Sequence, residues 1–427
     1  MRRRVVQRLL AATIAIVAAG SASAQPLATP EKVTFDEAIR RALERNPGVA
    51  EAAQAILRAE TLLQHAQTVY RPTIGASVTT TVLDAARGFD EFVTQPRTQS
   101  LVDGSVSYPV LAASRWAERA QAQDQIRVAR LGVGETRRQV GFATGQAYLA
   151  VIAQQRLVDV NLRARENAQS HVDYARARLE GGVGSRLNEQ RASQELATGD
   201  VLLEDARLAL RRAQEALGVL LAADAPIDAS GEPAFEVVTT VPPTEEWLTQ
   251  RSDVQLFSAQ IDAAERVYRD SWRDWVPSAT AAFEPQLVTP SGLFQPSRTW
   301  RGFVAFSVPI FDGGVRRANK REREVAVTTA RIQLTDVELR ARADLRTAQA
   351  VIDSSERGLG QARLAAQHAE EVLRITDVAF RAGATTNIEL IDAQRGARDA
   401  DTAAAQAEDR VRQGRLDLLV ALGRFPG

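Results

Sequence analysis

The 427-residue chain balances 53 basic against 53 acidic side chains and contains no cysteine. This composition excludes disulfides and thiolate metal sites, and it leaves no basic field of the kind that binds nucleic acid. Aromatic residues make up only 5% of the chain, and the abundance of Ala, Arg, Glu and Gln favours long helices packed through small side chains.

Residues 1–24 have the pattern of an export signal. Arginines precede an apolar run from Leu9 to Ala19, and the small-x-small sequence Ala22-Ser23-Ala24 follows it. We therefore expect cleavage of a signal peptide before Gln25. An uncleaved membrane anchor is the alternative, but the apolar run has about half the length that a membrane span needs. Without the four signal arginines, 49 cations face 53 carboxylates, which is a net charge of −4.

The two halves of the chain are similar in sequence. Residues 46–83 align with residues 251–288, about 205 positions later, so that Pro72 matches Pro277. The run Ser107-Tyr108-Pro109-Val110 returns as Ser307-Val308-Pro309-Ile310. This period is far longer than the roughly 20 to 50 residues of a solenoid repeat, and it indicates a duplicated half-domain.

Each half is expected to begin with helices. Thr34 is the predicted N-cap of a short helix, with Glu37 completing a capping box. Apolar residues at three- and four-residue spacing then predict a helix from about Gly48 to Tyr70, which Pro72 ends. The second half predicts the corresponding helix at about residues 253–275.

Beyond these helices, apolar residues alternate with small polar ones, which is the period of a β-strand. We predict strands at about 73–83 and 101–110 in the first half, joined as a hairpin across a polar loop. The counterparts in the second half are predicted at about 278–288 and 299–310.

A very long helix and a returning helix follow each hairpin. The first pair is predicted at about 114–179 and up to 221, and the second at about 315–380 and 387–422. A helix of roughly 65 residues is close to 100 Å long at 1.5 Å per residue. The expected organisation is a first repeat at 25–221, a linker at 222–246 and a second repeat at 247–427.

Four strands with one apolar face cannot close a barrel alone, and open sheet edges are not viable in lipid. Strands of about ten residues in an exported chain match the length of outer-membrane strands. We therefore expect several copies of the chain to close one barrel, with the helices continuing the tube into the periplasm. Ordinary soluble hairpins are the alternative.

A set of motifs, in order and in two copies, resembles the TolC-type outer membrane efflux proteins, or outer membrane factors. The resemblance covers residues 31–425. It rests on the opening FDEAIRRALERNP, the repeated helix–Pro–strand transition, the Ser-x-Pro-(Val/Ile) strand exits, and Phe380-Arg381-Ala382-Gly383 followed by Glu389-Leu390-Ile391-Asp392-Ala393-Gln394. The implied fold is mainly α with a small β part. In it, three protomers share one twelve-stranded barrel, and duplicated long-helix hairpins form a periplasmic α-barrel.

The resemblance also implies a function and its partners. A TolC-type homotrimer is the passive exit duct of a tripartite efflux pump or a type I secretion system, without a cofactor. It sits in outer membrane lipid and extends into the periplasm, where an adaptor protein connects it to an inner-membrane transporter. Nucleic acid is not an expected partner.

In this family the duct is gated at its periplasmic tip. Matched on the glycine turn, Glu389 and Asp392 fall on acidic tip positions, and Phe380 falls on a gate tyrosine of TolC. Asn188 stands where TolC has an aspartate and Thr385 where it has an arginine, so the ion pairs of that latch are not reproduced. A ring of carboxylates would favour cations. The alternative is that Glu389 and Asp392 are solvated charges on a helix face.

The two tip turns are the expected adaptor contacts. Glycine permits the reversal of the chain, so a purely structural role would also explain it there. The residues concerned are Gly181, Gly182, Gly184, Gly383 and Thr385.

No catalytic or metal site is expected. His65, His171 and His368 are scattered, with no second ligand at helical spacing, and no nucleophile constellation, phosphate loop or catalytic carboxylate pair is evident. The sequence therefore predicts a channel and not an enzyme. The main alternative is a soluble periplasmic coiled-coil adaptor or scaffold, which should carry a lipoyl-like β-domain that this sequence lacks. A cell-envelope hydrolase is a third reading, countered by the missing catalytic set.

Overall fold

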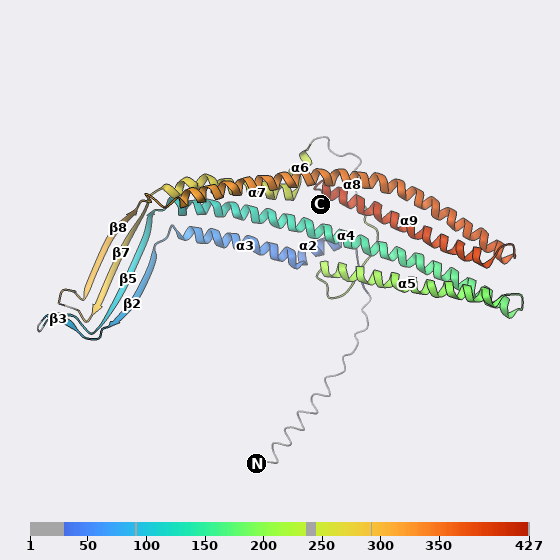
Figure 1. Ribbon diagram of the computed structural model, residues 1–427, viewed down its shortest axis with the longest axis horizontal. Coiled ribbons are helices and arrows are strands. Elements are labelled where there is room, and N and C mark those ends of the chain that lie inside the picture. The colour runs from blue at the N-terminus through green and yellow to red at the C-terminus, as the bar shows by residue number, and fades with distance from the viewer. Residues whose placement is uncertain (1–29, 90–91, 236–244, 292, 426–427) are drawn as a thin grey trace, which may run out of the picture.

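The computed structural model describes residues 30–89, 92–235, 245–291 and 293–425. The predicted signal peptide lies outside these residues. The molecule is a long rod of helices with a β-sheet at one end and two helix-to-helix turns at the other (Figure 1). The expected mainly α fold with a small β part is confirmed.

The first half of the chain forms a two-helix-thick rod. It consists of α2 (Phe35–Arg45), α3 (Pro47–Thr68), α4 (Ala113–Glu180) and α5 (Arg186–Leu220). Both α3 and α5 pack along α4, α3 on the part nearer the sheet and α5 on the part nearer the turn (Figure 1). Two shorter helices can accompany one long helix in this way because all three rise equally per residue.

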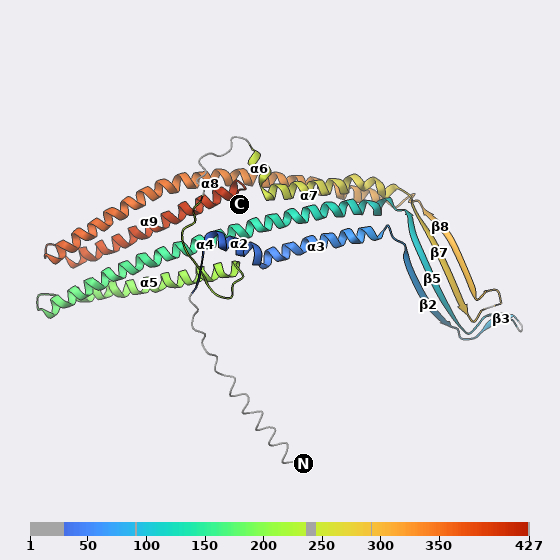
Figure 2. The same cartoon turned by 180° about the vertical axis from the view of Figure 1, so that it is seen from behind.

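The second half repeats this arrangement. It consists of α6 (Glu246–Gln250), α7 (Ser252–Arg269), the 3₁₀ helix η1 (Asp270–Trp275), α8 (Val315–Arg381) and α9 (Asn387–Ala421). Helices α7 and α9 pack along α8, and the view from behind shows the two rods running side by side (Figure 2). The α-helical geometry expected as far as Trp275 ends at Arg269, and the chain tightens to a 3₁₀ helix before Pro277.

One four-stranded antiparallel sheet joins the two halves. Its strands are β2 (Thr73–Val82), β5 (Thr98–Leu111), β7 (Ser278–Thr289) and β8 (Arg298–Ser307), in the order β2-β5-β7-β8. The central pair β5–β7 comes from different halves. Every residue of the two edge strands is exposed. A small ribbon, β3 (Arg87–Phe89) with β4 (Phe92–Gln95), extends from the loop that we expected to be only polar.

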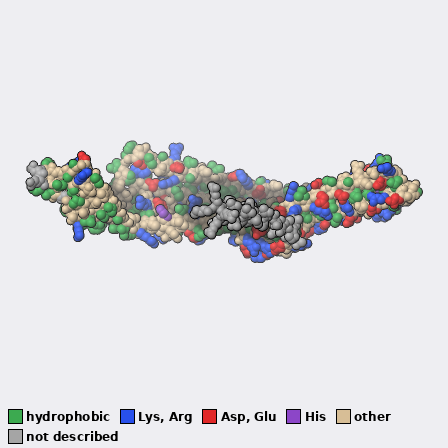
Figure 3. Space-filling model, turned by 90° about the horizontal axis from the view of Figure 1, so that it is seen from below, with side chains coloured by type: hydrophobic (Ala, Val, Ile, Leu, Met, Phe, Trp, Pro, Cys, Tyr) green, Lys and Arg blue, Asp and Glu red, His purple; other side chains and the backbone are tan. Residues whose placement is uncertain are grey.

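The sheet and the rod differ in surface chemistry. Basic and acidic side chains are interspersed along the helices, whereas the sheet end shows few charged side chains and many hydrophobic ones (Figure 3). Among its most exposed apolar residues are Ile74 at 80% and Phe306 at 74%.

No helix in the described parts of the chain combines the length and the apolarity needed to cross a membrane.

The capping box expected at Thr34 is only half present. The Thr34 hydroxyl accepts from the Glu37 amide at 3.3 Å, but the Glu37 carboxylate binds Arg40 and Arg41. Two guanidinium groups offer charge-assisted hydrogen bonds, which are stronger than a bond to one neutral amide. The prediction of a reciprocal box at this position was therefore wrong.

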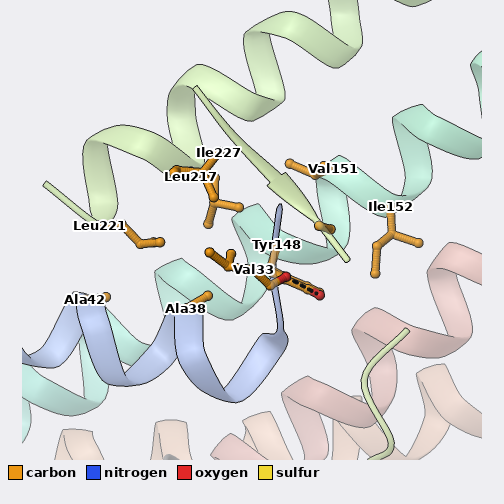
Figure 4. Close-up of a cluster of buried hydrophobic side chains, with 10 residues drawn as sticks. Val33, Ala38, Ala42, Tyr148, Val151, Ile152, Leu217, Leu221 and Ile227 are labelled. Carbon is orange, nitrogen blue, oxygen red and sulfur yellow. Dashed lines mark hydrogen bonds between the residues drawn. The ribbon is translucent and has the colours of Figure 1, made fainter. Parts of the chain in front are cut away.

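The segment predicted as a linker contributes to the core. Strand β6 (Ile227–Ala229) pairs in parallel with β1 (Glu31–Val33), and Ile227 is only 2% exposed. The Tyr148 hydroxyl of α4 lies 3.1 Å from the Val33 carbonyl oxygen and 2.9 Å from the Gly231 carbonyl oxygen, and it shares its single proton between these two acceptors. Figure 4 shows these elements converging on Tyr148. The part of the predicted linker at 236–244 lies outside the described residues.

Three buried clusters hold the middle of the rod together. The first surrounds Tyr148 and consists of Val33, Ala38, Ala42, Tyr148, Val151, Ile152, Leu217, Leu221, Ile227 and Ala229. The second packs Trp247 and Leu248 of α6 against α8 and α9. The third joins the halves, because Leu149 of α4 contacts Leu416 and Val420 of α9.

We predict that Tyr148→Phe destabilises the middle of the rod by about 1 kcal/mol, because a fully buried side chain loses its hydrogen bond to the backbone carbonyls of Val33 and Gly231. Thermal unfolding of the purified full-length protein in detergent measures the change. Tyr108→Phe is the matched control, since Tyr108 is exposed on β5. Equal melting temperatures for the two variants would contradict the role assigned to the Tyr148 hydroxyl.

Candidate functional site at the helical tip

The turn between α4 and α5 is a Schellman motif. Gly182 has φ 75°, and the Val183 amide donates back to the Arg178 carbonyl at 3.1 Å. A left-handed residue at this position favours glycine. Gly184 is restricted in another way, since a Cβ there would lie 2.7 Å from the Arg178 carbonyl carbon. Gly181 has an ordinary φ of −74°, so the turn does not require glycine at that position.

The turn between α8 and α9 has the same design. Gly383 has φ 77°, and the Ala384 amide donates to the Ala379 carbonyl at 2.8 Å. Here the helix that follows begins with a complete capping box. The Thr386 amide donates to the Glu389 carboxylate at 3.1 Å, and the Glu389 amide donates to the Thr386 hydroxyl at 3.4 Å. Glu389 therefore has a structural role that the sequence analysis did not assign to it.

A cavity of about 520 Å³ lies between the two turns. The predicted site residues among those that line it are Gly184, Asn188, Phe380, Gly383 and Thr385.

Glu389 and Asp392 do not line this cavity. Both are exposed on the first turns of α9, and their three-residue spacing places them on one face of that helix. The structure thus brings the gate residues predicted from the sequence to one end of the molecule, but it separates the acidic pair from Asn188 and Phe380.

Phe380 packs across the boundary between the two halves. It is only 6% exposed, and its ring contacts His171 and Tyr174 of α4 edge-on, with centroid distances of 5.4 and 5.7 Å. The Tyr174 hydroxyl donates to the Arg381 carbonyl at 3.3 Å. Because phenylalanine has no hydroxyl, Phe380 holds α4 and α8 together through apolar contact.

A buried polar contact lies beside Phe380. The His171 Nε2 atom is 2.7 Å from the Asn387 side-chain oxygen, and both residues are 5% exposed. Burial lowers the pKa of His171 below its ordinary value of 6.5, although its hydrogen bonds and the nearby carboxylates Asp377 and Glu195 oppose this. His171 is therefore expected to be neutral at neutral pH, and it links α4 to α9.

An ion pair makes the next contact between the halves. Glu195 of α5 is 5% exposed, and it accepts from Arg395 of α9 at 2.6 and 2.8 Å. Arg398 approaches the same carboxylate at 3.7 Å. The removal of one partner from a buried pair leaves an uncompensated charge, which is strongly destabilising.

The sequence did not point to Asn387, Glu195, Arg395 or Arg398, and His171 was weighed there only as a member of a metal site, which we did not expect. All of them are polar residues on long helices rich in polar residues. Without the packing of the second half, no periodicity separates a buried polar side chain from a solvated one.

We predict that acidification loosens the tip. The contact with neutral His171 is fully present above the ordinary pKa of 6.5 and is lost as the pH falls below it, since protonation would place a charge in a buried site. Hydrogen–deuterium exchange at residues 165–180 and 385–398, corrected for the intrinsic rate, should increase from pH 7.5 to pH 5.5 by several-fold, a range chosen to bracket the ordinary histidine pKa.

Two substitutions control this experiment. His171→Gln cannot titrate and should abolish the pH response, whereas His368→Gln alters an exposed histidine and should leave it unchanged. Equal corrected exchange at the two pH values in the unmodified protein would contradict the prediction.

The chain is similar in sequence to a described protein family and to known proteins. Residues 244–424 match the family described as Outer membrane efflux protein. The cobalt-zinc-cadmium resistance protein CzcC of Cupriavidus metallidurans is 25% identical over 375 residues, which are 85% of this chain and 83% of CzcC. Outer membrane protein OprJ of Pseudomonas aeruginosa is 29% identical over 153 residues, 34% of this chain and 31% of OprJ.

Solved outer-membrane proteins share the fold. The CmeC outer membrane channel of Campylobacter jejuni has a TM-score of 0.78 at 14% identity, covering 95% of this chain and 91% of CmeC. The outer membrane protein VceC of Vibrio cholerae has a TM-score of 0.73 at 15% identity, covering 91% of this chain and 96% of VceC. Together with the duplicated rods and the shared sheet, these similarities show that the chain has the fold of these outer-membrane proteins and that its second half, residues 244–424, matches the family described as Outer membrane efflux protein.

Proposed function

We propose that the protein is the outer membrane channel of a tripartite efflux pump, a passive exit duct that is gated at its periplasmic tip. One observation carries this proposal. A sheet with open edges and exposed apolar residues leads directly into rods built on α4 and α8. These helices have 68 and 67 residues, so each is about 100 Å long. Such a molecule reaches far from a membrane while one end is embedded in it.

The proposed assembly is a homotrimer. With the order β2-β5-β7-β8 and antiparallel pairing throughout, β2 of one copy can pair with β8 of the next without breaking the alternation of strand directions. Each copy therefore closes the edge of its neighbour, which removes the unpaired backbone groups that lipid does not tolerate. Three copies would give the twelve strands of the family fold, with the helices in the periplasm.

The tip is the proposed contact for a periplasmic adaptor, which in turn meets an inner-membrane transporter that supplies the energy. Large apolar side chains are exposed there, including Val183 at 71%, Leu187 at 57% and Ile388 at 47%. Exposed apolar residues at a surface rimmed by polar ones favour a protein contact. The exposed glycines Gly181, Gly182 and Gly383 allow close approach of a partner's backbone at the same place.

Export by an efflux pump is favoured over type I secretion. The support comes from CzcC, whose name denotes resistance to cobalt, zinc and cadmium and whose sequence aligns over most of this chain. The described residues include no group of three or more His, Cys, Asp or Glu side chains that could hold a metal ion. A duct that conducts an ion does not need such a site.

Fractionation followed by reconstitution tests the proposed function. We expect recovery in the outer membrane fraction as a heat-sensitive oligomer, and discrete conductance steps when the purified protein is added to a planar lipid bilayer. Recovery of a monomer from the soluble periplasm, with no conductance, would instead support the adaptor or scaffold alternative.

For the gate, we predict that Glu389→Gln with Asp392→Asn lowers the preference for cations in the bilayer by at least about twofold, because a ring of carboxylates concentrates positive ions. Glutamine at position 389 retains the capping interaction with Thr386, so the change tests charge and not helix stability.

The matched control for the gate experiment is Glu204→Gln with Asp205→Asn. This pair removes the same charge from an exposed part of α5 far from the turn. Measurement of reversal potentials in a salt gradient compares the two double variants. An unchanged reversal potential in the tip variant would mean that Glu389 and Asp392 do not line the constriction.

A further inference from the structure

A collar of basic residues lies where the sheet meets the helices. We define the collar as residues 69–72, 112–121, 268–277 and 308–323, which flank the ends of the four long strands. It contains ten Lys and Arg residues and five Asp and Glu residues, a net charge of +5. Since residues 25–427 carry −4 in total, the chain outside the collar carries −9. Positive charge is therefore concentrated at this one level of the molecule.

Most of the collar cations have no protein counter-ion. Arg273, Arg316 and Arg323 bind carboxylates within the collar. Within the described part of the chain, the other seven make no ion pair, and all seven are exposed. They are Arg71, Arg115, Arg119, Arg269, Arg317, Lys320 and Arg321. These seven cations are therefore free to bind an anion from outside the chain.

The paired cation Arg316 shows how the collar is kept rigid. It binds Asp312 at 2.6 Å and lies over the Trp275 ring at 4.2 Å. The bonds from Arg316 and from the Gly314 amide lower the pKa of Asp312 to about 2. This carboxylate is therefore ionised at any physiological pH, and it is already used by its own neighbours.

Aromatic rings with a polar edge hold several of the cations at the surface. Arg119 lies over the Tyr70 ring at 6.0 Å, and Lys320 lies over the Tyr268 ring at 5.7 Å. Tyr70 also stacks on Trp116 at 6.5 Å. A cation held over a ring retains its outward donors, and Trp and Tyr are enriched where protein crosses from lipid to water.

The collar directly borders the most apolar exposed surface of the chain. At its sheet side the collar itself includes Ile310 and Phe311, which are 90% and 89% exposed, and Ile74, which is 80% exposed, follows directly beyond it on β2. On the other side begin the charged helices. Along the molecule, the surface therefore changes from the apolar sheet, through the cationic and aromatic collar, to helices of mixed charge. This order of surfaces places the collar where the headgroup region of a lipid leaflet would lie.

We propose that the collar binds the phosphate groups of anionic phospholipids in the periplasmic leaflet of the outer membrane. Guanidinium groups match phosphate oxygens in charge and in bidentate geometry. This contact sets the depth of the sheet in the membrane and the level at which the helices leave it. The proposal rests on the proposed function, since it requires the sheet to lie in the outer membrane.

Lipid selectivity in proteoliposomes tests the proposal. The full-length protein is reconstituted in phosphatidylcholine vesicles that contain either spin-labelled phosphatidylglycerol or spin-labelled phosphatidylcholine. Electron paramagnetic resonance then gives the relative association of the two lipids with the protein. A cation near the surface contributes roughly fivefold in binding, so we expect a several-fold preference for phosphatidylglycerol that about 1 M salt abolishes by screening.

Two triple variants, each of which removes three positive charges, show which part of the protein causes the preference for phosphatidylglycerol. Arg71→Gln, Arg119→Gln and Arg317→Gln together remove three unpaired collar cations. The control combines Arg58→Gln, Arg176→Gln and Arg357→Gln, which are exposed on the helices and make no ion pair within the described residues. The collar variant should lose most of the preference, and the control should keep it.

The outcomes separate this inference from the proposed function. No lipid preference in the unmodified protein, or an equal loss in both triple variants, would overturn the collar proposal, while conductance of the same proteoliposomes would still support a channel. If the collar variant still conducts but no longer prefers phosphatidylglycerol, the result supports lipid binding by the collar. Absence of conductance in all samples would count against the proposed function itself.

Discussion

The structure depends on one constraint, namely the unpaired backbone groups at the two edges of a four-stranded sheet. Strands β2 and β8 expose every residue, and in lipid each unsatisfied amide or carbonyl is costly. A single chain cannot remove both edges. Duplication provides two hairpins, and the β5–β7 pairing joins them. We propose that the two edges that remain are paired between copies, which would make the chain one element of an assembly.

The rods follow from the same duplication. Because α3 and α5 together accompany α4, and α7 and α9 accompany α8, each half stays two helices thick along its length. The core is placed at mid-length around Tyr148 and Leu416, where the halves also meet. At the tip, the two halves are joined through Phe380, His171 and Glu195. We propose that these contacts open locally, as a gate at this end of the duct would require.

The order of elements, the strand positions and the two glycine turns could be predicted, since periodicity, proline and glycine are local signals. Strand β6 could not, because three residues within a turn-rich segment carry no period and pair with β1 nearly 200 positions earlier. The site was predicted only in part. Glycine turns and the residues near them were found, whereas Asn387 and Arg395 are defined by contacts between halves. Glu389 is compatible with two roles at once, because it caps helix α9 and is also proposed to place a charge in the pore.

Pairing of β2 with β8 between copies is the central claim, and disulfide cross-linking tests it most directly. The chain has no cysteine, so Ser77→Cys on β2 can be combined with single cysteines scanned along residues 299–303 of β8. The account predicts disulfide-linked dimers and trimers in outer membranes at one register, with three linked copies as the largest species. Monomers at every register, or only links within one chain, would contradict it.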